Sequence, residues 1–432
     1  MADEETLLAR HRRVLPNWLA LYYQHPIALV EGEGRRVRDA GGKEYLDFFG
    51  GILTTMTGHR VPAVVEAIRR QAERIVHTST LYLVPQQVEL AERIASLVPI
   101  PDARVFFTTS GTEANDTALL LATAFRGSNQ VLAMRNSYHG RSFAAMSVTG
   151  NRAWSASTLA PFQVTYVNGA YKLRSPFSHL DDAGYIAACA ADLERVLDTD
   201  VSGDPACLIA EPIQGVGGNT APPDGLYGAL KEILDRRGAL YISDEVQTGW
   251  GRTGEHFWGF QAHGIVPDMI TFAKGIANGV PLGGVVARAE IMNSISANSI
   301  STFGGNPLST AAALANLDYL ISADLQGNAL RMGRRLRAQL DELAKDSPVI
   351  AEVRGKGLMI GVELIQPGGL KPNPAAAAAA LEHAREHGLL LGKGGLYGSV
   401  LRIAPPLSVT EAEIDEGFAA IAAAVRAVET VR

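Results

Sequence analysis

Residues 268–284, DMITFAKGIANGVPLGG, join a short apolar run to a cluster of small residues, with a single lysine, Lys274, at the junction. Lysine is among the residue types least often fully buried, yet both flanks of this one have the composition of a protein interior. The run before it lacks polar alternation, which is typical of a strand covered on both faces. The stretch therefore indicates a buried strand that ends at a lysine.

Four other runs have the same character and are separated by helical patterns. They are RVFFTT (104–109), QVLAM (130–134), ACLIA (206–210) and ALYIS (239–243). Strands that alternate with helices predict an α/β core around a largely parallel sheet. In such sheets, active groups gather beyond the carboxyl ends of the strands. Polar residues come directly after four of the five runs: Ser110-Gly111-Thr112, Glu211, Asp244 and Lys274. Four such positions in one sheet predict one shared pocket.

Length and composition exclude several classes of protein. A chain of 432 residues is expected to form more than one domain. The formal net charge of −6 argues against a nucleic-acid partner, because neutralising phosphates requires clustered Lys and Arg. No apolar run approaches the roughly 18 residues that span a membrane. The two cysteines and the acidic start, MADEE, favour a reducing compartment, and we expect the cytoplasm.

The domain organisation follows from where the α/β pattern begins and ends. We expect a large domain over residues 76–325, with residues 1–75 and 326–432 together forming a smaller domain. Residues 31–49 have the pattern of a hairpin, and GLMIGVEL (357–364) that of a strand. Because both chain ends contain short strands outside the α/β pattern, we expect them to form one small α+β domain together.

Ser110 and Glu113 have the spacing of a helix-capping box, so a helix is expected to begin here. The spacing is explained by the cap alone. A second interpretation is that the free N–H groups and the dipole at the helix start bind a phosphate, with Gly111 allowing close approach.

Three further residues each have an ordinary and a functional interpretation. Tyr138 could lie in a surface loop or stack on a flat ring. Asp244 could cap a helix or keep a ring nitrogen protonated. Lys274 could extend its charge to solvent, or be a desolvated amine able to form a Schiff base. Together they meet the needs of pyridoxal phosphate: a phosphate site, a stacking ring, an acid and a lysine.

The stretch YISDEVQTGWGRTG (241–254), followed by PDMITFAKGIANGVPLGG (267–284), resembles the class III aminotransferases. The resemblance runs from about residue 15 to the C-terminus. HTSTLY (77–82), STFGGNP (301–307) and VRGKGLMIGVEL (353–364) are most similar to the alanine–glyoxylate branch, near the 4-aminobutyrate aminotransferases. The resemblance implies a fold-type I pyridoxal-phosphate transferase, with a mostly parallel central sheet covered by helices and a smaller α+β domain.

The resemblance also implies how the cofactor ring is held. Lys274 would form the Schiff base with the cofactor aldehyde and later move the proton. Asp244 would pair with the pyridinium nitrogen. Tyr138 would stack on one ring face and Val246 pack on the other, while Gln247 would bond the ring hydroxyl.

The phosphate of the cofactor is implied to lie between two subunits. Ser110, Gly111 and Thr112 would bind it from one chain. Thr302, in STFGGNP, would reach the phosphate of the neighbouring subunit. A homodimer or a higher homo-oligomer follows.

Four residues are implied to bind the substrate. Arg402 matches the arginine that binds an α-carboxylate, a group that a planar guanidinium can engage at both oxygens. Glu211 matches the residue that pairs with this arginine when an ω-amine enters. Arg141 matches an arginine for the distal carboxylate of 4-aminobutyrate-type substrates, and Ile52 would line the substrate side.

The expected reaction is ping-pong transamination of an α- or ω-amino acid with a small 2-oxo acid such as glyoxylate, pyruvate or 2-oxoglutarate. Two alternatives remain: an aminomutase or racemase on the same fold, and a pyridoxal-phosphate-binding protein without catalysis. His383 to His387 has the spacing of a zinc-peptidase helix, but we find no third ligand and expect no metal.

Overall fold

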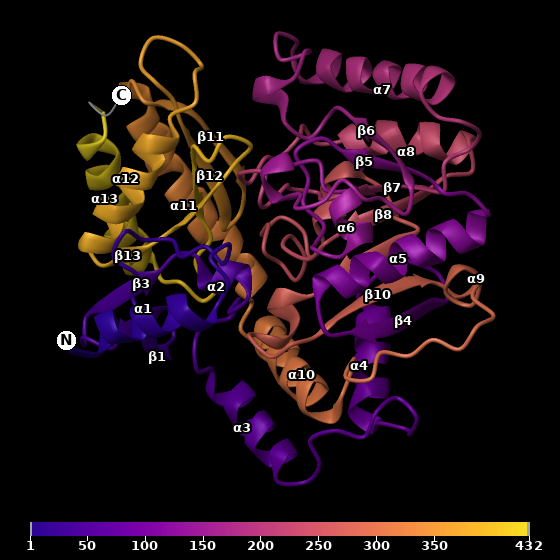
Figure 1. The fold of residues 1–432 in the computed structure, drawn as a ribbon, viewed down its shortest axis with the longest axis horizontal. Helices are drawn as coiled ribbons and strands as arrows, with labels where there is room; N and C mark the ends of the chain where they lie inside the picture. Colours follow the sequence, from indigo (N-terminus) through magenta and orange to yellow (C-terminus); the bar gives the residue numbers. More distant parts are fainter. Residues whose placement is uncertain (1, 430–432) are drawn as a thin grey trace.

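The computed structural model describes residues 2–429, and a seven-stranded sheet forms its centre (Figure 1). In spatial order its strands are β4 (Ala103–Thr108), β10 (Gly283–Arg288), β9 (Met269–Phe272), β8 (Leu240–Asp244), β7 (Cys207–Ala210), β5 (Gln130–Met134) and β6 (Gln163–Val167). Strand β10 runs antiparallel to both of its neighbours, and the pairs from β9 to β6 are parallel. The mostly parallel α/β sheet expected from the sequence is confirmed.

Helices cover both faces of this sheet. Helix α5 (Gly111–Arg126) packs on one face, whereas α7 (Asp182–Thr199) and α8 (Leu226–Arg236) pack on the other. Alternate residues of β7 follow this division: Cys207 lies in the core under α5, and Leu208 lies in the core under α7 and α8. Burial on both faces explains why these strands have no polar alternation.

Two four-stranded sheets lie beside the central one (Figure 1). The first contains β1 (Leu29–Glu33), β2 (Arg36–Asp39), β3 (Glu44–Asp47) and β13 (Leu389–Leu390). The second contains β11 (Ile350–Lys356), β12 (Met359–Leu364), β15 (Val400–Ile403) and β14 (Gly392–Gly394). The hairpin expected over residues 31–49 is wrong in detail, because residues 29–47 form three antiparallel strands. Since β13 pairs in parallel with β3, the first sheet contains both ends of the chain.

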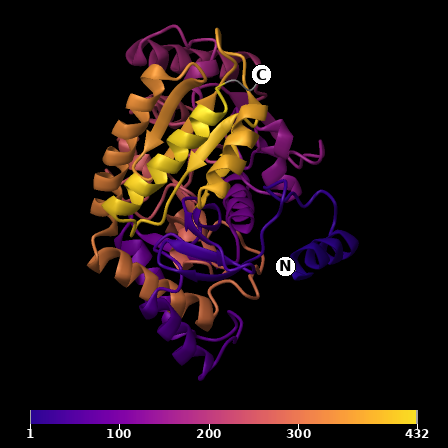
Figure 2. The ribbon, with the colours of Figure 1, turned by 90° about the vertical axis from the view of Figure 1, so that its left-hand side faces the viewer.

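The remaining helices lie around the three sheets (Figure 1). They are α1 (Ala2–Val14), α2 (Gly50–Leu53), α3 (Pro62–Ala72), α4 (Pro85–Ser96), α6 (Phe143–Ser147), α9 (Ala289–Met292), α10 (Pro307–Ser322), α11 (Leu325–Asp346), α12 (Pro374–Glu386) and α13 (Glu411–Ala427). Helices α11 to α13 pack beside β11 to β15, while α1 stands away from the body (Figure 2). The domain boundaries at residues 75 and 325 stay a prediction.

Asn373 caps α12 by accepting a hydrogen bond from the Ala376 N–H at 3.0 Å, and Pro374 occupies its first position. Across residues 2–429, no helix is long and apolar enough to span a membrane. The same part of the chain contains no group of three His, Cys, Asp or Glu side chains placed to hold a metal ion.

Candidate active site

A cavity of about 360 Å³ opens where β4, β7, β8 and β9 end. Nine of the residues singled out in the sequence line it: Ser110, Gly111, Thr112, Tyr138, Glu211, Asp244, Val246, Gln247 and Lys274. The shared pocket expected from the strand ends therefore exists.

Four other residues singled out in the sequence do not line this cavity. Arg402 is buried next to it and reaches Gln247. Ile52 is 45% exposed, and the Arg141 guanidinium lies 5.8 Å from the centre of the Trp18 ring. Thr302 is exposed on the surface of its own chain.

Lys274 follows β9 and begins a short 3-10 helix, η4 (Lys274–Ala277). Its φ is +47°, in the left-handed region, where residues other than glycine are strained. Burial lowers the pKa of Lys274 to about 8 against a raising effect of Asp244, and Arg402 lowers it further. The amine is therefore neutral in a large fraction of molecules near pH 8.

Asp244, at the end of β8, is held by three donors. Asn115 Nδ2 donates to Asp244 Oδ2 at 2.8 Å, and His139 Nδ1 donates to the same oxygen at 2.7 Å. The Val246 N–H donates to Asp244 Oδ1 at 3.1 Å. These contacts satisfy a buried carboxylate and orient it.

Sequence reasoning missed Asn115 and His139. Asn115 lies on the buried side of α5, where its Oδ1 also accepts a hydrogen bond from Thr271 Oγ1 at 2.7 Å. His139 is directly next to Tyr138 in the chain, and its ring is fully buried. Asn115 lies in the polar start of α5, TEANDT (112–117), so its neighbours in the sequence gave no signal of its role.

The start of α5 forms the floor of the cavity. Ser110 Oγ accepts a hydrogen bond from the Glu113 N–H at 3.3 Å, as expected. The expected capping box is only half formed, because the Glu113 carboxylate accepts from the Thr109 N–H at 2.7 Å instead of from Ser110. The N–H groups of the first turn have no partners within the helix and suit an anion. A Cβ on Gly111 would lie 3.0 Å from Val246 Cγ2, so glycine keeps this approach open.

Glu211 and Arg402 have separate partners. The Glu211 carboxylate accepts hydrogen bonds from the Tyr138 N–H at 2.9 Å and the Gly215 N–H at 2.8 Å. Burial raises the pKa of Glu211 above its usual range. Arg402 Nη2 donates to Gln247 Oε1 at 2.7 Å, and Arg402 Nε donates to Asn219 Oδ1 at 3.3 Å. The structure thus joins Arg402 to two amides and not to Glu211.

Residues 20–425 match the class III aminotransferase family. The chain belongs to this family. It is 39% identical to alanine–glyoxylate aminotransferase 2 homolog 2 from Arabidopsis thaliana, a match that covers 95% of this chain and 85% of the relative.

Solved structures of aminotransferases have the same fold. An (S)-enantioselective ω-transaminase from Thermomicrobium roseum matches with a TM-score of 0.90 and 35% identity over 98% of each chain. A pyridoxal-phosphate-bound amine transaminase from an uncultivated Pseudomonas species matches with a TM-score of 0.89 and 31% identity, covering 96% of this chain and 98% of that one. This class III aminotransferase therefore has the fold-type I architecture, and its cofactor is pyridoxal phosphate.

The groups in the cavity fit this cofactor. A half-buried amine, a fixed carboxylate, an open helix N-terminus and an aromatic ring line one space. Transamination of an amino acid with a small 2-oxo acid is the activity of the family and of this chain. The aminomutase, racemase and inactive alternatives are not favoured.

Proposed function

We propose that this aminotransferase uses Lys274 as its proton carrier, Asp244 as the acid that faces the cofactor nitrogen, and Arg402 as the carboxylate site. The observation that carries the proposal is that Lys274 and Asp244 line one cavity with the free N-terminus of α5. When bound, pyridoxal phosphate supplies an electron-withdrawing ring that makes the donor carbon acidic.

Lys274 has the properties of a general base. Because burial lowers its pKa to about 8, a large fraction of the Nζ amine is neutral near pH 8 and can accept a proton from the donor carbon. Lys274 Nζ would then return this proton to the reacting carbon on the cofactor side. Three donors orient the Asp244 side chain, which would face the ring nitrogen and keep it protonated.

The remaining contacts are proposed for residues that line the same cavity. Ser110, Gly111 and Thr112 would hold the phosphate at the start of α5, where the helix dipole favours an anion. Tyr138 and Val246 would face opposite sides of the ring. Gln247 Nε2 would reach the ring hydroxyl while its Oε1 accepts from Arg402.

The substrates that we propose are an α- or ω-amino acid as donor and a small 2-oxo acid as acceptor, such as glyoxylate, pyruvate or 2-oxoglutarate. Relatives named for alanine–glyoxylate and for ω-transamination support both kinds of donor. Arg141, 5.8 Å from the centre of the Trp18 ring, would bind a distal carboxylate, and Ile52 would border the donor side chain.

The enzyme is proposed to be a homodimer. Apolar side chains are strongly exposed in two neighbouring segments, Leu81 to Leu83 and Ile300 to Phe303, and Leu83 is 93% exposed. The His77 and Phe303 rings lie 5.1 Å apart, which joins these segments into one surface. An apolar surface of this kind favours a second copy of the chain, and Thr302 lies within it. Tyr82→Glu should produce monomers in sedimentation, and an unchanged assembly would contradict this interface.

The proposed compartment is the cytoplasm. Cys189 and Cys207 are both buried and unpaired. Unpaired cysteines suit a reducing compartment.

One activity matrix tests the proposed function. Amino donors with and without an α-carboxylate are combined with the three 2-oxo acids, and formation of the new carbonyl product is measured. Arg402→Ala should weaken use of every 2-oxo acid. An unchanged apparent affinity for the acceptor would place the carboxylate site elsewhere.

A further inference from the structure

The loop between Gln214 and Thr220 contacts both Glu211 and Arg402, the two residues that the resemblance implied would pair in the active site. Its ends close on each other, because Gln214 N–H donates to Thr220 O at 3.0 Å and Thr220 N–H donates to Gln214 O at 3.2 Å. From this loop, Gly215 N–H reaches Glu211 Oε2, and Asn219 Oδ1 accepts a hydrogen bond from Arg402 Nε. The position of the loop therefore influences where Arg402 lies.

The small sheet holds this loop in place at three points. Asn219 Nδ2 donates to the Ile360 carbonyl of β12 at 2.9 Å, and Arg354 Nε of β11 donates to the Gly218 carbonyl at 3.0 Å. A Cβ on Gly361 would lie 2.4 Å from Gly218 O, so the loop backbone rests directly on β12 at a glycine. Gly361 is also the residue opposite Arg402 in the pairing of β12 with β15.

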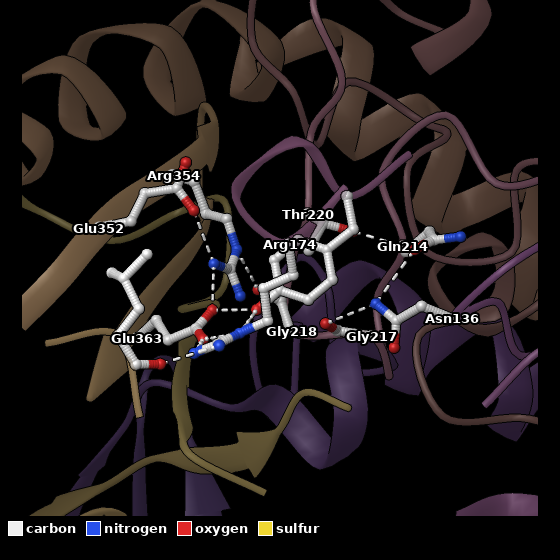
Figure 3. A network of polar contacts seen from close by, with 11 residues as sticks. Asn136, Arg174, Gln214, Gly217, Gly218, Thr220, Glu352, Arg354 and Glu363 are labelled. Carbon is white, nitrogen blue, oxygen red and sulfur yellow. Dashed lines mark hydrogen bonds and ion pairs between the residues drawn. The ribbon is translucent and has the colours of Figure 1, made fainter. Parts of the chain in front are cut away.

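Arg354 is itself fixed by a buried ionic network (Figure 3). Arg354 Nη1 contacts Glu363 Oε2 at 2.6 Å and Glu352 Oε2 at 2.7 Å. Glu363 is fully buried and also accepts a hydrogen bond from Arg174 Nε at 2.8 Å. Buried charges with this many partners are held in one geometry.

We propose that Asn219 is a positioning residue for Arg402 and that the Arg354–Glu363 pair anchors its loop. This inference rests on the proposed role of Arg402 in binding the substrate carboxylate. Asn219 fixes the guanidinium through Nε, and Gln247 fixes it through Nη2. Within residues 2–429, Arg402 Nη1 has no hydrogen-bond partner.

This arrangement prepares Arg402 for a carboxylate. Both partners are neutral amides, so the full positive charge of the guanidinium remains for the substrate. Glu211, which the resemblance pairs with this arginine, instead accepts hydrogen bonds from two backbone N–H groups. Without Asn219, Arg402 Nε would have no hydrogen-bond partner. The guanidinium could then turn away from the orientation in which Nη1 is free for the substrate.

The test uses the holoenzyme and propionate, a carboxylate with neither an amine nor a carbonyl to react. Calorimetry gives its Kd, and kinetics with pyruvate give KM and kcat. Asn219→Ala should raise both the Kd for propionate and the KM for pyruvate by about five- to tenfold. The kcat and the absorption spectrum of the bound cofactor should remain close to those of the wild type, which a general loss of structure would change.

Two further variants extend the test. Asn219→Asp should weaken propionate binding more than Asn219→Ala, because a carboxylate there would neutralise Arg402. Arg354→Met removes the contact with Gly218 O and should raise the propionate Kd in the same direction. Asn168→Ala is the matched control, since Asn168 Nδ2 donates to Asp192 Oδ2 at 2.8 Å and has no contact with Arg402.

The outcomes separate this inference from the function on which it rests. Propionate binding that survives Arg402→Ala would overturn the assignment of the carboxylate site. If Arg402→Ala abolishes binding while Asn219→Ala leaves Kd and KM within twofold of wild type, the positioning role of Asn219 is wrong. If only Arg354→Met is without effect, the anchor is wrong and the role of Asn219 stands.

Discussion

The ionisation of Lys274 can be measured directly in the cofactor-free protein. Burial lowers its pKa from 10.5 to about 8. At pH 8, half of the Lys274 amines should therefore be neutral, compared with roughly one in 300 for a lysine of ordinary pKa. Because only the neutral amine reacts with an acylating reagent, Lys274 should be modified far faster than surface lysines at this pH.

The assay is a short pulse of acetic anhydride at each half unit of pH from 6 to 10.5, followed by mass spectrometry of the Lys274 peptide. Labelling should rise with pH and reach half of its maximum near pH 8. Lys345 provides the internal control, because Glu342 raises its pKa and keeps it protonated in this range.

Two variants test whether each neighbouring charge raises or lowers the pKa of Lys274. Asp244 stabilises the charged amine, so Asp244→Asn should move the Lys274 midpoint to lower pH. Arg402 destabilises the charged amine, so Arg402→Gln should move it to higher pH. A wild-type midpoint above pH 10 would refute the claim that desolvation prepares Lys274 as a base.

Further variants test catalysis, cofactor pairing, the ionic anchor and the Arg402–Gln247 contact. Lys274→Ala should lower turnover by at least about a hundredfold while circular dichroism shows an intact fold; turnover near that of the wild type would contradict its role. Asp244→Asn should lower kcat by about a hundredfold or more in steady-state assays, and a small effect would remove it from the cofactor. Glu363→Ala leaves Arg354 without its buried carboxylate and should lower the free energy of unfolding, measured in urea, by about 3–5 kcal/mol. An unchanged free energy of unfolding would show that the pair does not stabilise the fold. Gly215→Ala would place a Cβ 2.3 Å from Gln247 Oε1, so the KM for a 2-oxo acid should rise by about tenfold; an unaffected KM would show that Gln247 can move without consequence.

The central sheet was largely predictable because its strands are continuous apolar runs. Each of the five predicted strands exists, with ends displaced by no more than one residue. Two strands were missed. In β6, Gln163 and Thr165 interrupt the apolar pattern, and β10 begins with Gly283 and Gly284. A Cβ on Gly283 would lie 2.7 Å from Ser110 O, a contact between distant segments that no local pattern contains.

The cavity was predictable to the extent that its residues follow strands. Lys274, Asp244 and Glu211 were placed by that rule, and all three line the cavity. Contacts between the central sheet and the small sheets could not be predicted in the same way. Arg402 donates a hydrogen bond to Gln247 because β15 of a small sheet faces the loop after β8. No pattern in the sequence of either segment indicates that the two segments meet.

The parallel pairing of β3 with β13 has a consequence for biosynthesis. Leu46 lies opposite Leu389, so the first small sheet cannot close until the ribosome has synthesised β13, long after β3. Until then Leu46 and Phe48, both buried in the finished enzyme, lack their late-synthesised neighbours. The nascent segment that contains β3 should accordingly bind holding chaperones during translation and be released once β13 has emerged.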